Sequence, residues 1–279
     1  MNRCTIRGSA RVEGVGLFGG RPGAVTLERT SGGGIVFVIG GVEVAAAAGN
    51  VVKATGGVAR NTSLAGCATI EHVMSALIGL GVTEARVVVE GPEVPIGDGS
   101  AEMFVDAIAR AGGLHQLPEP FEPIRLKVPV EVRGAGGEFI RATPRARAGC
   151  SFEYTLDYAG RPGPAVGVPR QTARWDGRAA TYQVDVAPAR TFCLASEAKA
   201  MRDRGLFAHV TPREMLVLDD LAGEPIDNTL RFENEPARHK LLDLIGDVGL
   251  LGRPLQADVV AERSGHALTH EFCRAVLGG

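Results

Sequence analysis

One histidine and two aspartates near the C-terminus share a face of a predicted helix. His239, Asp243 and Asp247 are spaced i, i+4 and i+8, which places their side chains in a single stripe. Leucine, isoleucine and valine fill most of the remaining faces, so we expect this helix to be buried and its polar stripe to need partners. An imidazole and a carboxylate one turn apart can bind a metal ion, or they can form a buried hydrogen-bonded pair. The helix by itself favours neither alternative.

A glutamate and a second histidine open another helix. Glu71 and His72 fall in the first turn of a helix predicted for residues 69–81 from its apolar spacing, with Thr69 as the N-cap. Because the helix dipole favours a carboxylate in this turn, the pair by itself is most simply a solvent-facing polar turn. The interpretation changes when the two helices are considered together.

The two helices together supply the ligand set of a catalytic zinc site. His72 joins His239 and Asp243 as a third protein ligand, which leaves a fourth position open for water. Glu71 is adjacent to one ligand without being a ligand itself, so its carboxylate is placed to accept a proton from that water. We therefore expect a Zn²⁺ site with Glu71 as the general base.

A further histidine, His266, follows a Ser-Gly turn between a predicted strand and the last predicted helix. A histidine on a glycine turn is well placed to face a cleft. By itself it is more simply a helix-start residue whose polar groups bond the backbone. His270, one helical turn later, is expected to be structural.

The pattern of elements predicts two similar halves. Residues 71–111 read as a helix, an apolar strand, a glycine-bearing loop and a helix, and residues 238–277 repeat this order. The proline-rich segment 113–123 between them is predicted as a linker. We therefore expect an α+β protein with two similar β-α-α-β sandwich domains, at residues 1–117 and 124–279, and with the active site at their interface.

Shorter patterns predict the remaining elements. Residues 4–40 are expected to form strands joined by tight turns. Within them, Gly14–Gly19 matches a literal GxGxxG, but a strand-like run follows instead of a helix, so we interpret it as a turn and reject a dinucleotide site. Residues 160–180 are expected to be irregular. Further strands are predicted near 124–133, 138–143, 150–158, 181–186 and 255–262, and further helices near 100–111, 195–204 and 235–251.

Composition narrows the class of function. The chain has 279 residues, with 30 basic and 32 acidic side chains and a net charge of −2, so it has no global attraction to nucleic acid or to an anionic membrane. No apolar run reaches the roughly 18 residues that a membrane-spanning helix needs, and the N-terminus lacks the apolar core of a signal peptide. Five scattered cysteines without a CxxC pair argue against a disulfide framework. We expect a cytoplasmic monomer that acts on a small molecule.

Six short motifs, in a fixed order, carry a family resemblance. They are Thr69–Leu77, Gly91–Ala101, Ala189–Phe192, Leu230–Glu235, Arg238–Asp247 and Ser264–Leu268. Together they closely resemble the UDP-3-O-acyl-N-acetylglucosamine deacetylase family, the zinc amidases of lipid A biosynthesis, and the resemblance extends over nearly the whole chain.

The resemblance implies an activity and a set of site residues. The activity is zinc-dependent hydrolysis of the N-acetyl group of UDP-3-O-acyl-N-acetylglucosamine, an early committed step of lipid A biosynthesis. The implied residues are the zinc ligands His72, His239 and Asp243, the general base Glu71, the acid and oxyanion-stabilising His266 with its partner Asp247, the oxyanion contact Thr191, and the substrate contacts Lys240 and Arg263.

Two segments depart from the family pattern. Phe18 stands where the family's first glycine turn usually has a histidine, and residues 207–216 replace a glycine-serine-acid-asparagine loop. Both segments border the substrate site in the family, so two alternatives stay open. One is an amidase that acts on another N-acetylated nucleotide sugar, and the other is a non-catalytic binding protein of the same fold. Glu71 and His266 argue against the second, because metal binding needs neither of them.

Overall fold

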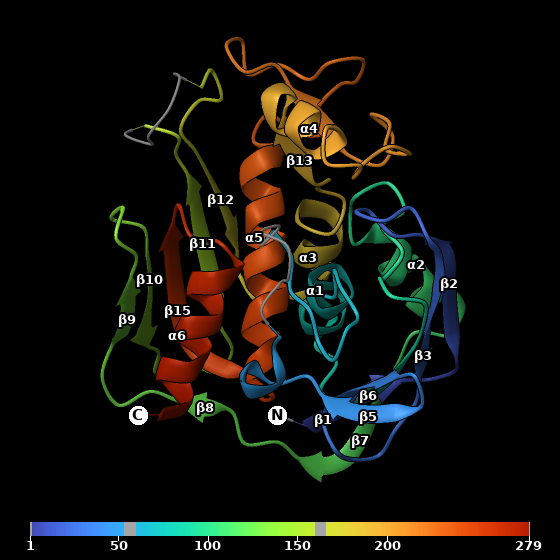
Figure 1. Ribbon diagram of the computed structural model, residues 1–279. Helices are drawn as coiled ribbons and strands as arrows, with labels where there is room; N and C mark the ends of the chain where they lie inside the picture. The colour runs from blue at the N-terminus through green and yellow to red at the C-terminus, as the bar shows by residue number, and fades with distance from the viewer. Residues whose placement is uncertain (1, 53–59, 160–165, 279) are drawn as a thin grey trace.

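Two mixed β-sheets stand on either side of a central group of helices (Figure 1). The computed structural model describes residues 2–52, 60–159 and 166–278, so residues 160–165 of the predicted irregular segment lie outside the described residues. The strands are β1 (Asn2–Ile6), β2 (Ala10–Val15), β3 (Pro22–Glu28), β4 (Ile35–Ile39), β5 (Val42–Ala45), β6 (Ala85–Glu90), β7 (Leu114–Pro120), β8 (Ile124–Arg125), β9 (Val130–Arg133), β10 (Phe139–Pro144), β11 (Ser151–Leu156), β12 (Gln171–Trp175), β13 (Phe192–Leu194), β14 (Leu216–Leu218) and β15 (Leu255–Glu262). The helices are α1 (Glu71–Leu80), α2 (Glu102–Arg110), α3 (Ala179–Asp185), α4 (Ala195–Arg202), α5 (Glu235–Val248) and α6 (His266–Gly278).

The two sheets share one topology. The N-terminal sheet has the order β2-β3-β6-β4-β5, and the C-terminal sheet has the order β9-β10-β15-β11-β12, with β8 added beside β15. In each sheet the strand that follows the first long helix is central, pairing antiparallel on one side and parallel on the other. The predicted α+β fold with two similar halves is confirmed, and among the described residues no sheet spans both halves.

Helices α1 and α5 pack against each other at the centre of the molecule (Figure 1). Gly246 of α5 lies directly against the backbone of α1, because a Cβ added at this position would overlap the carbonyl oxygen of Glu71. Only a glycine permits this close approach. The approach brings the first turn of α1 beside the polar stripe of α5, and so it brings the two sequence motifs together.

We expect Gly246→Ala to destabilise the protein, because the new methyl group must push α1 and α5 apart. Overpacking of this kind costs about 1–3 kcal/mol, which urea denaturation measures as a lower midpoint. Gly278→Ala is the matched control, because Gly278 also belongs to a helix and an added Cβ there has open space. Equal midpoints for the two variants would contradict the proposed close approach.

Two predictions of local structure are wrong at the join between the halves. The predicted linker 113–123 contains strand β7, which pairs antiparallel with β1 in a separate two-stranded sheet. Prolines are tolerated there because an edge strand leaves backbone positions that need no donor. Thr69 does not cap α1, since it has a positive φ of 61° and its hydroxyl donates to Glu93. Ile70 occupies the N-cap position.

Two further predictions are wrong in the second half. Residues 181–186 alternate polar and apolar side chains, which is typical of a strand, but residues 181–185 belong to helix α3 and Val186 is its C-cap. Tyr182 of α3 is fully buried and its hydroxyl donates to Ser75 Oγ of α1 at 2.8 Å, so tertiary packing overrides the alternation. The segment predicted as irregular, 160–180, contains strand β12.

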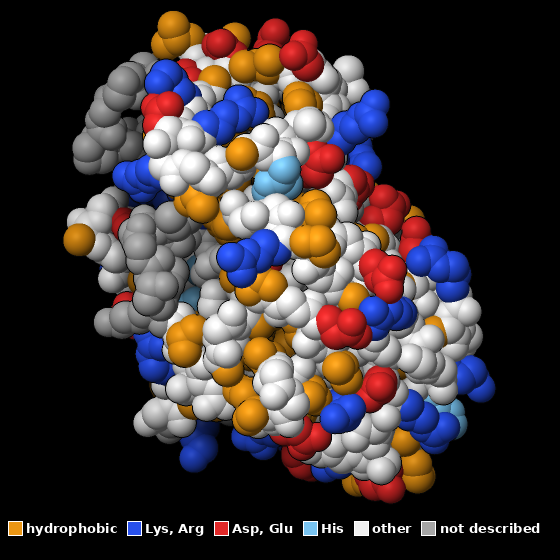
Figure 2. Space-filling view, turned by 45° about the vertical axis from the view of Figure 1, so that its right-hand side comes forward, with side chains coloured by type: hydrophobic (Ala, Val, Ile, Leu, Met, Phe, Trp, Pro, Cys, Tyr) orange, Lys and Arg blue, Asp and Glu red, His pale blue; other side chains and the backbone are white. Residues whose placement is uncertain are grey.

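The surface mixes both signs of charge. On the face shown in Figure 2, acidic and basic side chains both occur along the right-hand rim, and hydrophobic side chains gather in small groups towards the middle of the face. Within the described residues, no helix combines the length and the apolar character that crossing a membrane requires.

Candidate active site

A cavity of about 400 Å³ lies where the two halves meet, and both halves line it. It contains eight of the nine predicted site residues, namely Glu71, His72, Thr191, His239, Lys240, Asp243, Arg263 and His266. The ninth residue, Asp247, is buried directly behind His266. Helices α1, α5 and α6 therefore bring together side chains that are far apart in the sequence.

His72, His239 and Asp243 form a compact cluster that fits a metal ion. One ligand atom from each lies within 4.8 Å of the others, and all three side chains are buried. Asp243 Oδ1 lies 3.3 Å from His239 Nε2 and 3.8 Å from His72 Nε2. This oxygen is buried and accepts no hydrogen bond within the described residues. A buried carboxylate oxygen without a partner, facing two imidazoles, is a donor set that suits zinc.

Hydrogen bonds orient two of these three side chains on the side away from the cluster. His239 Nδ1 lies 3.1 Å from the carbonyl oxygen of Ala189, and because only an N–H can bond this oxygen, the lone pair is left on Nε2. Lys240 donates to Asp243 Oδ2 at 2.6 Å, which leaves Oδ1 as the free oxygen. Burial and the neighbouring His239 lower the pKa of His72 to about 3, and burial also lowers the pKa of His239. Both imidazoles are therefore neutral at pH 7, which is the form that binds metals.

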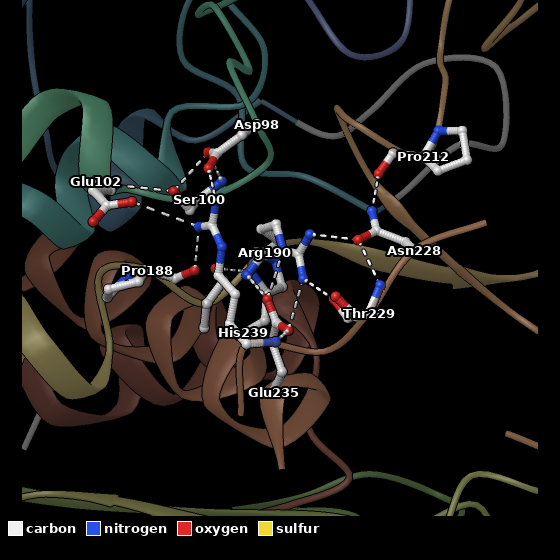
Figure 3. A network of polar contacts seen from close by, with 12 residues as sticks. Asp98, Ser100, Glu102, Pro188, Arg190, Pro212, Asn228, Thr229, Glu235 and His239 are labelled. Atoms are coloured by element: carbon white, nitrogen blue, oxygen red, sulfur yellow. Dashed lines mark hydrogen bonds and ion pairs between the residues drawn. The ribbon is translucent and has the colours of Figure 1, made fainter. Parts of the chain in front are cut away.

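A buried ion pair supports the segment that carries Ala189 (Figure 3). The guanidinium of Arg190 donates to both carboxylate oxygens of Glu235, at 2.8 and 3.1 Å, and also to the carbonyl oxygen of Thr229. The backbone N–H of Arg190 bonds the same carboxylate. The network therefore holds the Ala189 carbonyl against His239 and places Thr191 at the cavity.

Glu71 is buried, with 3% of its surface exposed, so the solvent-facing interpretation of the first turn is wrong. Its Oε2 accepts the backbone N–H of Thr62 at 3.0 Å. Burial, together with the nearby carboxylates of Asp243 and Asp247, raises the pKa of Glu71 to about 8. Glu71 is therefore mostly protonated at pH 7, and its ionised form, which prevails as the pH rises through about 8, is a stronger proton acceptor than an exposed carboxylate.

His266 is held as an imidazolium beside the same cavity. Its Nδ1 donates to Asp247 Oδ2 at 2.7 Å, and its Nε2 lies 3.9 Å from Asp243 Oδ2. Burial alone would lower the pKa of His266, but the charge and hydrogen bond of Asp247 outweigh it and raise the pKa to about 9. The site thus places the carboxyl group of Glu71 and the imidazolium of His266 around one cluster that could hold a metal ion.

The two departures from the family pattern form one structural feature. The ring of Phe18 packs against Phe207, with centroids 5.4 Å apart. His209 Nε2 lies 2.9 Å from the carbonyl oxygen of Gly16 in the same glycine turn. Both phenylalanines line the cavity, beside Leu17, Met201 and Met215.

Sequence reasoning missed Thr62 and Glu93. The Thr62 hydroxyl donates to Asp247 Oδ1 at 2.6 Å, and the buried Glu93 accepts backbone bonds from Phe18 and Gly19 as well as the hydroxyl of Thr69. Neither residue belongs to a periodic pattern. Glu93 falls within the Gly91–Ala101 motif, which is the only signal that could have singled it out.

The fold and the site together have the features of a hydrolase with a candidate metal site, because a buried His₂Asp cluster lies beside a separate buried carboxyl group and an imidazolium. The chain belongs to the LpxC family, described as UDP-3-O-acyl N-acetylglycosamine deacetylase, whose family model matches residues 3–278. It is similar to the UDP-3-O-acyl-N-acetylglucosamine deacetylase of Anaeromyxobacter dehalogenans (strain 2CP-C), with 36% identity over 279 residues, 99% of this chain and 87% of the relative. The protein of the same name from Anaeromyxobacter sp. (strain Fw109-5) is 35% identical over 279 residues, 99% of this chain and 88% of the relative.

Proposed function

We propose that this protein is a zinc-dependent deacetylase that hydrolyses the N-acetyl group of UDP-3-O-acyl-N-acetylglucosamine, an early step of lipid A biosynthesis. The observation that carries the proposal is the convergence of the His₂Asp cluster, Glu71 and His266 on one cavity in a chain of this family. The names of the two relatives support the substrate.

We assign the metal site to His72, His239 and Asp243. A Zn²⁺ ion bound there would act as a Lewis acid on the acetamide carbonyl and would make a water molecule easier to deprotonate. Asp243 Oδ1 and the Nε2 atoms of the two imidazoles are the atoms that face one another, so we assign them as the ligand atoms.

The chain's own groups move the protons. Glu71 accepts a proton from the water molecule whose oxygen attacks the acetamide carbon. As negative charge develops on the carbonyl oxygen, the imidazolium of His266 and the hydroxyl of Thr191 stabilise it. His266 then donates a proton to the amine nitrogen as the carbon–nitrogen bond breaks, and acetate and the free amine leave.

The lining of the cavity supports a substrate with both an anionic and an apolar part. Lys240 and Arg263 supply positive charge, and we assign them to the nucleotide sugar. Phe18, Phe207 and Met201 supply apolar surface, which suits an acyl chain. The wall formed by Phe18 and Phe207 also keeps open the second candidate, an amidase that acts on another N-acetylated nucleotide sugar.

A deacetylation assay tests the proposal directly. We expect the protein to release acetate from the UDP-linked 3-O-acylated sugar, and a chelator to stop the release until zinc is added back. UDP-N-acetylglucosamine without the acyl chain is the comparison substrate. Faster release from this comparison substrate would favour the second candidate, and no release from either would overturn both.

We expect Asp247→Asn to shift the alkaline limb of the activity profile to lower pH. Asp247 stabilises the protonated form of His266, so its loss lowers the pKa of that imidazole from about 9 towards its ordinary value near 6.5, by at least about one pH unit. His266 then loses its proton earlier as the pH rises, and turnover falls. Steady-state kinetics across pH, with metal content measured in parallel, give the result.

Asp106→Asn, which replaces an exposed carboxylate on α2, is the control and should leave the pH profile unchanged. An unshifted limb in a folded, metal-loaded variant would show that Asp247 only stabilises the fold.

A further inference from the structure

Thr62 touches both proton-transfer groups of the site. It lies in the loop before α1, with only 1% of its surface exposed. Its backbone N–H donates to Glu71 Oε2 at 3.0 Å, and its carbonyl oxygen accepts the N–H of Ile70, so the loop is fixed to the start of α1. Its side chain crosses to the other half of the molecule, where it meets Asp247 of α5 and two histidines of α6, His266 Nδ1 at 3.3 Å and His270.

The direction of the hydrogen bonds around this hydroxyl follows from its single proton. Thr62 Oγ1 lies 2.6 Å from Asp247 Oδ1, and an ionised carboxylate cannot donate, so the hydroxyl proton lies between these two oxygens. Thr62 Oγ1 therefore acts as an acceptor towards His270 Nε2, 2.9 Å away, and His270 carries a proton on that nitrogen. The result is a series of two hydrogen bonds, in which His270 donates to Thr62 and Thr62 donates to Asp247.

We propose that Thr62, supported by His270, is a positioning residue that orients the carboxylate of Glu71 towards the cavity and the carboxylate of Asp247 towards His266. The inference rests on the proposed function, because it concerns the roles of Glu71 and His266 in that reaction. Thr62 acts through these groups and does not line the cavity itself.

Thr62 bonds one oxygen of each of the two carboxylates, which leaves the second oxygen of Glu71 for the cavity and the second oxygen of Asp247 for His266. Of the two oxygens of Glu71, only Oε2 is bonded to another group in the described part of the chain, so Oε1 is the one available to the cavity. Asp247 accepts Thr62 on Oδ1 and His266 on Oδ2, which fixes the plane of the imidazole. A small rotation of either carboxylate would misalign a proton transfer without removing any group that takes part in it.

Replacing Thr62 by valine tests the inference, because valine keeps the shape and the backbone N–H but lacks the hydroxyl. We expect the kcat of Thr62→Val to fall about 10- to 100-fold, the size typical of lost supporting hydrogen bonds, with KM and zinc content unchanged. Thr62→Ser restores the hydroxyl and should restore kcat. Thr83→Val is the matched control, because the hydroxyl of the buried Thr83 also makes two bonds, with the backbone of Cys4, and does not line the cavity. It should lower thermal stability and leave kcat unchanged.

A second measurement separates this inference from the proposed function. The proton on His266 Nδ1, bonded to Asp247, is expected to give a downfield NMR signal whose position changes in Thr62→Val, whether or not the protein is active. If the unmodified protein does not deacetylate the substrate but this signal moves, the proposed function fails and the positioning by Thr62 stands. An unchanged signal, or a kcat equal to that of the unmodified protein, would overturn the positioning role.

If Thr62→Val does not fold, a second variant tests the same inference. His270→Leu removes the group that donates to Thr62 and keeps the Thr62 hydroxyl. It should lower kcat at constant KM, and an unchanged kcat would equally overturn the inference.

Discussion

Replacing Glu71 by glutamine is expected to remove most of the deacetylase activity and to leave the metal site intact. The amide has nearly the same shape, and its oxygen can still accept the backbone N–H of Thr62, so the first turn of α1 should keep its conformation. An amide cannot take a proton from water, however. Loss of a general base costs about 10²- to 10⁴-fold in kcat. Steady-state kinetics and elemental analysis of the same preparation measure both parts of the prediction.

A matched control separates the loss of a base from the loss of a buried charge. Glu84 is also buried and its carboxylate accepts a backbone N–H, from Gly34 at 2.7 Å, but it does not line the cavity. Glu84→Gln should therefore change stability and not kcat. If Glu71→Gln lost its metal, Glu71 would be a ligand and the assignment of the base would be wrong. If it kept full activity, another group would accept the proton.

The sequence was most informative where one helix carries several functional groups. The spacing of His239, Asp243 and Asp247 places them in one stripe whatever the tertiary structure, and the apolar residues around them predict the burial that the structure shows. The three protein ligands that a catalytic zinc site needs added His72 from a second helix. That these helices meet at Gly246 depends on packing, and no local pattern predicts a helix contact across such a distance in the chain.

Other parts of the site depend on contacts between loops. Thr62 lies in a segment without periodicity, and the side chains that it joins are 9, 185, 204 and 208 positions away in the sequence. Phe18 and Phe207 meet in the same way, so the two departures from the family pattern look independent in the sequence and are one wall of the cavity in the structure.

The burial of Glu71 shows why local rules fail at a site. The helix dipole predicts a solvent-exposed carboxylate in the first turn, and for an isolated helix that expectation is sound. Here α5 covers the turn, and the carboxyl group is kept in place by one backbone N–H. A buried carboxylate with so little compensation costs stability, and such costs are typical of functional groups.

Removing the proposed zinc ligands is expected to abolish both metal binding and activity. The double variant His239→Ala/Asp243→Ala loses two of the three ligands and the unpartnered oxygen that faces the imidazoles. Gently purified unmodified protein should contain one divalent ion per chain by elemental analysis, and the double variant should contain none. His115→Ala, on strand β7 and away from the cavity, should retain the metal.

The same variants predict how chelation affects stability. An ion that binds the folded chain and not the unfolded chain raises the melting temperature, so a chelator should lower the Tm of the unmodified protein and of His115→Ala. It should not change the Tm of the double variant, which has no ion to lose. Full metal occupancy in the double variant would place the ion elsewhere. If the chelator lowered the Tm of all three proteins equally, the ion that contributes to stability would not be held by His239 and Asp243. Either result would exclude the assigned metal site while leaving the family and the fold untouched, because neither of these rests on the metal.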